Sequence, residues 1–112
     1  MSVIVRALIN SKYASSSLTT EYTAPADTKA IIDKFTATNI DTESRTIDVH
    51  LVPSGDTAGD ANKIVMESSI GSGEEKDISK LKSHVLEPGD FIAVNGEVAS
   101  KIILRASGRE VT

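Results

Sequence analysis

The chain has 112 residues, of which 39% are hydrophobic and none is cysteine. A chain of this length closes around one hydrophobic core, and the lack of thiols excludes both a disulfide framework and a thiolate metal site. Sixteen acidic and twelve basic residues give a net charge of −4 with both signs interspersed, so the basic stripe that nucleic-acid phosphates require is absent and we expect no nucleic-acid partner.

The N-terminal segment, residues 1–16, is predicted to be a separate strand or arm. Its apolar run is too short to span a membrane and lacks a basic leader, so we expect no membrane partner and synthesis in the cytoplasm. Apolar side chains fall on both faces of this run, which fits either a strand buried on both faces or an arm covered only by a partner. The candidate protein-protein contact residues are Val3, Ile4, Val5, Leu8 and Ile9. We expect residues 10–17 to form a loop.

Residues 17–112 are predicted to form a single all-β domain. A strand over residues 18–24 ends at Pro25, which cannot donate to a central ladder. Two further strands, residues 29–39 and 46–52, are joined by a polar turn and predicted to form a hairpin. From their alternation we expect these core residues: Ile31, Phe35, Ile47, Val49 and Leu51.

The second half of the chain continues the strand-and-turn pattern. A polar loop at residues 56–62 precedes a strand at 63–70, and further strands are expected at 91–94 and 101–106. Asn95-Gly96 is a hairpin-turn signal. Apolar residues at helical spacing between Asp77 and Leu86 predict a short helical corner that Asp77 caps. Seven or eight short strands without βαβ alternation favour a small β-sandwich or jelly-roll-like domain.

Candidate catalytic and metal-binding patterns are weak. Neither His50 nor His84 lies in a recognised nucleophile or metal-ligand spacing. Asp56, Asp60 and Asn62 lack the terminal glutamate that a calcium loop needs in register. We therefore expect no catalytic, cofactor-binding or metal-binding residues and no enzymatic activity.

Four segments carry a resemblance to a known group of proteins. They are TTEYTAPADTKAIIDKFTATN, TIDVHLVPSGDTAGDANKIV, HVLEPGDFIAV and KIILRASGREVT. Together they resemble small structural proteins of tailed bacteriophages and prophages, which decorate or cement capsids or occupy the neck and tail. The resemblance covers roughly residues 18–112 and implies a virion component with a β-sandwich or jelly-roll fold. No individual functional residue carries over.

Within this group, our leading hypothesis is a head decoration or cement protein that stabilises the capsid. Its partners would be the major capsid protein or other virion proteins, and it would act as a homo-oligomer in the virion after assembly in the host cytoplasm. Two alternatives remain open, a neck, tail or fibre-attachment component and a host-surface or carbohydrate-binding module. In the last case exposed aromatics such as Tyr13 or Tyr22 would bind the sugar.

Overall fold

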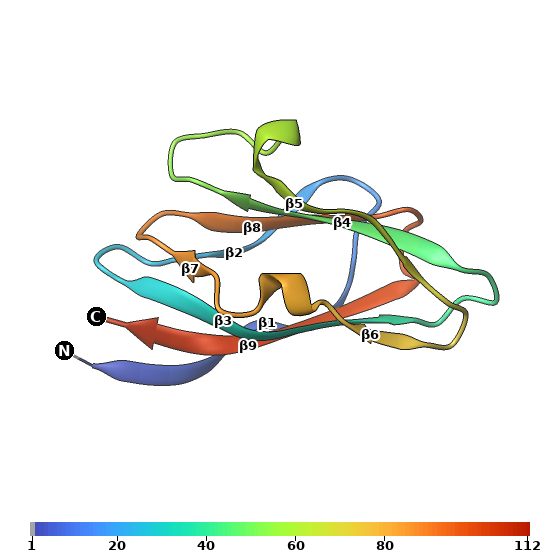
Figure 1. The fold of residues 1–112 in the computed structure, drawn as a ribbon, viewed down its shortest axis with the longest axis horizontal. Helices are drawn as coiled ribbons and strands as arrows, with labels where there is room; N and C mark the ends of the chain where they lie inside the picture. Colours follow the sequence, from blue (N-terminus) through green and yellow to red (C-terminus); the bar gives the residue numbers. More distant parts are fainter. Residues whose placement is uncertain (1) are drawn as a thin grey trace.

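Two antiparallel β-sheets pack face to face in the computed structural model, which describes residues 2–112 (Figure 1). The first sheet contains, in spatial order, β1 (Val3–Tyr13), β9 (Ile102–Val111), β3 (Lys29–Asn39) and β6 (Glu75–Asp77), with β7 (Val85–Leu86) also paired to β3. The second sheet contains, in spatial order, β2 (Thr19–Thr23), β8 (Phe91–Gly96), β4 (Arg45–Val52) and β5 (Lys63–Ile70). The predicted small β-sandwich is confirmed.

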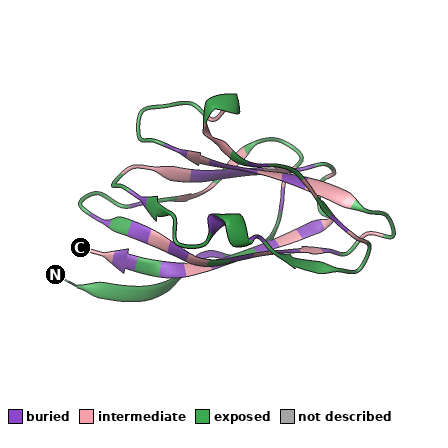
Figure 2. Ribbon diagram, in the orientation of Figure 1, coloured by how far each residue is buried: buried purple, intermediate pink, exposed green. Residues whose placement is uncertain are grey.

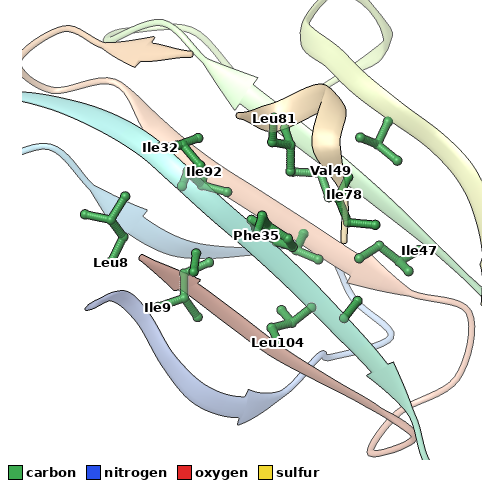
Figure 3. Packing of buried hydrophobic residues seen from close by; sticks show 14 of the residues in the cluster. Leu8, Ile9, Ile32, Phe35, Ile47, Val49, Ile78, Leu81, Ile92 and Leu104 are labelled. Atoms are coloured by element: carbon green, nitrogen blue, oxygen red, sulfur yellow. The ribbon is translucent and has the colours of Figure 1, made fainter. Parts of the chain in front are cut away.

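The core lies between the two sheets and is built by alternation along the strands. In β9, Ile102, Leu104 and Ala106 are buried while the residues between them are more exposed, the pattern of a strand with one face on a core. Phe35 of β3 lies at the centre of the cluster (Figure 3). Gly108 continues the inward face, and a Cβ there would lie 2.1 Å from the carbonyl oxygen of Ile31, so only glycine allows this approach of β3 to β9.

The expected core residues are confirmed in part. Phe35, Ile47 and Val49 are buried, and Leu51 is partly buried against the cluster. Ile31 is only half-buried, and its neighbour Ile32 takes the core position. The reason is a register shift in β3 between Ile32 and Lys34, which changes the face of the strand at that point.

The predicted hairpin between the two central strands is wrong. β3 pairs with β9, β6 and β7, whereas β4 pairs with β5 and β8, so the chain crosses from one sheet to the other at residues 40–44. Arg45 fixes this crossover through ion pairs to Asp41 at 2.7 Å and Glu43 at 3.1 Å. The hydrogen bond from Arg45 lowers the pKa of Asp41.

Asn95-Gly96 does not form the predicted hairpin turn. Both residues are the end of β8, where Asn95 pairs with Asp48 and Gly96 with Ile47 of β4. The chain turns only after them, at residues 97–101, and crosses to β9 in the first sheet. Pairing with β4 therefore overrides the local turn preference.

The short helical corner is present as one 3₁₀ turn, η2 (Ser79–Leu81), whose Leu81 is buried. Asp77 ends β6 and does not cap the turn, because the preceding residue is Ile78. A second turn, η1 (Asp60–Asn62), lies in the loop between β4 and β5. Within residues 2–112 neither turn, nor any other helix, has the length and apolar character needed to cross a membrane.

Replacing Phe35 with alanine is expected to cost about 3–5 kcal/mol of unfolding free energy, because a fully buried ring leaves a cavity that the packed sheets cannot close. Urea denaturation followed by circular dichroism measures this cost. Tyr13→Ala is the matched control, since Tyr13 is exposed, and its change should stay within about 1 kcal/mol. Equal losses in the two variants would contradict the placement of Phe35.

Candidate functional site

The N-terminal half of β1 is exposed along the edge of the first sheet (Figure 2). Of the predicted contact residues, Val3, Ile4 and Val5 are 53%, 44% and 79% exposed. β1 nevertheless belongs to the sandwich, because it pairs with β9 along its length. The predicted loop over residues 10–17 is confirmed only in its second half, since the strand continues to Tyr13 and residues 14–18 lie outside the strands.

Leu8 and Ile9 are corrected to core residues of the same chain, with 5% and 2% exposure (Figure 3). A register shift between Ala7 and Ile9 interrupts the pairing with β9. At such an irregularity two successive side chains can turn toward the same face of the strand. The contact surface predicted from the sequence therefore reduces to Val3, Ile4 and Val5.

The backbone pairing shows which groups of β1 face the open edge. Ser2 and Thr112 exchange both backbone hydrogen bonds, at 3.2 and 2.9 Å. In an antiparallel ladder such pairs alternate, so Ile4 and Arg6 also bond to β9. The N–H and C=O groups of Val3, Val5 and Ala7 consequently point away from β9, and no described strand pairs with β1 on that side.

A polar seam joins β1 and β9 to β2 of the opposite sheet. Arg6 binds Glu110 at 2.7 Å, and the hydroxyl of Tyr22 donates to the other oxygen of Glu110 at 2.5 Å. Lys12 binds the buried carboxylate of Glu21 at 2.7 Å. Burial and the hydrogen bond to Glu110 raise the pKa of Tyr22 well above its usual range. These contacts hold the two sheets together at the β1 side.

The seam could not be found in the sequence. Tyr22 and Glu110 are 88 residues apart and no local motif connects them. Only the register of β1 on β9 brings Glu110 beside Ile4 and within reach of Arg6. The only local hint is a tyrosine in a strand that a proline follows, and this pattern does not identify the residue to which the tyrosine bonds.

The residues considered for catalysis and metal binding do not come together. His50 is buried on β4 with no hydrogen-bond partner for Nδ1, and His84 is exposed before β7. Among residues 2–112 no group of three or more histidine, aspartate or glutamate side chains is arranged to hold a metal. Asn62 closes its loop internally, accepting from the Gly59 N–H and donating to the Thr57 carbonyl, both at 3.0 Å.

Two surface hollows are present in the part of the chain that the structure describes. One, of about 180 Å³, lies between β5 and the η2 turn and is lined by Met66, Lys76 and Lys80 among others. The other, of about 250 Å³, lies beside Tyr13 and Ile103. Both are smaller than the roughly 300–1,000 Å³ of typical small-molecule sites. Of the two tyrosines considered for sugar binding, only Tyr13 is largely exposed, because the Tyr22 hydroxyl is engaged in the seam.

Comparison with known proteins gives one informative match. No family model and no curated protein matches the sequence. Among solved structures, the chain is similar to a structure described as Bacillus endospore appendages that form a novel family of disulfide-linked pili. The TM-score is 0.56 at 12% identity, covering 98% of this chain and 88% of the other. At this identity the likeness concerns the fold alone.

In the Tyr22→Phe variant, the unfolding free energy is expected to fall less steeply with rising pH in the alkaline range than in the unchanged protein. Because the folded state holds the Tyr22 proton more tightly than the unfolded chain, stability falls as pH rises above about 10, the pKa of an unfolded tyrosine. One proton sets an upper limit of about 1.4 kcal/mol per pH unit, which solvent screening reduces.

Chemical denaturation at a series of pH values from neutral to alkaline measures this slope. Tyr13→Phe is the control, since the Tyr13 hydroxyl has no partner of the kind that Glu110 provides for Tyr22. The control should keep the slope of the unchanged protein. Identical slopes for Tyr22→Phe and the unchanged protein would contradict the described role of the seam.

Proposed function

We propose that the protein is a non-enzymatic structural protein of a tailed-bacteriophage virion, and specifically a head decoration or cement protein. The observation that carries the proposal is the exposed apolar half of β1, with Val3, Ile4 and Val5 on an open sheet edge. Apolar strands with unpaired edges are surfaces for protein contact. The virion as the place of that contact rests on the resemblance of residues 18–112 to phage structural proteins.

A rigid sandwich suits the mechanical task of a cement protein. Such a protein stabilises a shell by adding buried surface across the joints between capsid subunits. A specific contact of standard size buries about 800 Å² on each partner, which a molecule with principal extents of 46, 26 and 20 Å can offer on one side. The seam and the core keep the two sheets in fixed relation, so the surface is presented without a prior ordering cost.

The structural neighbour supports a structural task in general terms. The endospore appendages are described as pili, and the structural match covers 98% of this chain. Those pili are disulfide-linked, whereas the present chain has no cysteine. Any contact between its copies is therefore made without disulfide bonds.

Two alternatives keep specific support. A neck, tail or fibre-attachment component would use the same exposed edge and differ in copy number. A carbohydrate-binding module would use Tyr13, which is exposed beside the hollow of about 250 Å³. Aromatic side chains at such hollows can stack against sugar rings.

Purified virions of a phage that encodes this chain are expected to contain it in roughly hundreds of copies, as closed head symmetry requires. Quantitative mass spectrometry against the major capsid protein measures the ratio. About a dozen copies or fewer would favour the neck or tail. Absence from the virion would contradict the proposal.

Deletion of the gene provides the matched comparison. Heads that lack the protein lose the buried surface across their joints and should release DNA at a lower temperature than complete heads. Addition of the purified protein should restore the higher temperature.

A further inference from the structure

We propose that β1 pairs with β1 of a second copy of this chain, antiparallel and about a two-fold axis, with Val5 opposite Val5 of the other copy. The inference deepens the proposed function, on which it rests for the assignment of β1 to protein contact. It adds the identity of the partner and the register of the contact.

The first argument comes from the backbone. The N–H and C=O groups of Val3, Val5 and Ala7 face the open side of β1, as the bonds between Ser2 and Thr112 require. The pairing with β9 is regular over residues 3–7 and breaks only after Ala7. This regular segment has Val5 at its midpoint. Two copies can therefore satisfy all three open pairs of groups together only when Val5 lies opposite Val5.

The second argument comes from the side chains. In this register Val3 lies opposite Ala7 of the other copy on one face, beside the Val5 pair, so that face is entirely apolar. On the other face Ile4 lies opposite Arg6, and Arg6 keeps its ion pair with Glu110. If Arg6 lay on the two-fold axis in place of Val5, the two Arg6 side chains would face one another. If Ile4 lay on the axis, the paired segment would be shorter.

The third argument comes from the other sheet edges, which are short, irregular or charged. β2 has a register shift between Thr20 and Tyr22, and β5 contains Glu67 at a φ of 46°. β6 is three residues long with the sequence Glu-Lys-Asp, and β7 has two residues. Such features block edge-to-edge pairing. Among the described strands, only β1 offers a regular apolar edge, so the edge of another copy that fits it is β1 itself.

A pairing of identical edges is closed. Once two β1 strands have paired, neither copy retains a regular apolar edge among its described strands, so growth stops at two. The proposed contact therefore yields a dimer and not a fibre. The contact made by Val3, Ile4 and Val5 is then one between copies of this protein within the assembly, and other faces of the dimer would meet the capsid.

The test uses opposite charges at one position. Val5→Lys and Val5→Glu each place like charges opposite one another, and each should weaken the dimer by at least about tenfold. An equimolar mixture of the two variants should dimerise again, because lysine then faces glutamate. Sedimentation velocity over a concentration series measures all three samples. Met66→Lys is the matched control, because Met66 is 70% exposed on β5, and it should leave the dimer unchanged.

Cysteine cross-linking tests the register itself in the cysteine-free chain. Residues in a hydrogen-bonded antiparallel pair have Cα atoms about 5.5 Å apart, within the range that a disulfide spans. Val5→Cys should therefore form a disulfide-linked dimer on oxidation. Val3→Cys should not, since it lies opposite Ala7.

A chain that is monomeric at every concentration would overturn the inference. Equal cross-linking of the two cysteine variants would also overturn it, as would failure of the mixed lysine and glutamate variants to dimerise. If the protein is abundant in virions but does not pair through β1, the inference is wrong and the proposed function stands. If the protein forms a β1 dimer but is absent from virions, the proposed function is wrong and the inference stands.

Discussion

Pairing of β9 with both β1 and β3 is the interaction on which the rest of the structure depends. β9 lies between β1 and β3 in the first sheet, and its C-terminal end runs beside the start of β1, where Ser2 bonds to Thr112 (Figure 1). Its inward face supplies Ile102, Leu104 and Ala106 to the core, and Gly108 permits the close approach of β3. Its register on β1 also decides which backbone groups of β1 remain open.

The same pairing creates the polar seam. Glu110 is brought beside Ile4 by the register, and from there it binds Arg6 and Tyr22. A buried carboxylate without partners would be costly, but here each oxygen has one. The seam thus links β1 and β9 to β2 through polar contacts, beside the apolar core that Leu8 and Ile9 join. The N-terminal half of β1, with Val3, Ile4 and Val5, remains exposed and apolar.

Elements whose signal is local could be predicted from the sequence. The bounds of β3 and the burial of Phe35 follow from alternation and the polar residues that flank the strand. Partners in the sheets could not be predicted. The alternation of two successive amphipathic strands is the same whether they pair within one sheet or lie in opposite sheets across the core. The sequence therefore predicts a hairpin of β3 and β4, although the two strands belong to different sheets. The irregularity after Ala7 that buries both Leu8 and Ile9 has no sequence signature either.

The proposed self-pairing is tested most directly by hydrogen exchange of individual backbone amides, followed by NMR at low and high protein concentration. The account predicts that Ile4 and Arg6 are protected at both concentrations, because their N–H groups bond to β9. Val3, Val5 and Ala7 should become protected only at the concentration where the dimer forms. Exchange of these three amides at the same fast rate in the concentrated sample would contradict the account.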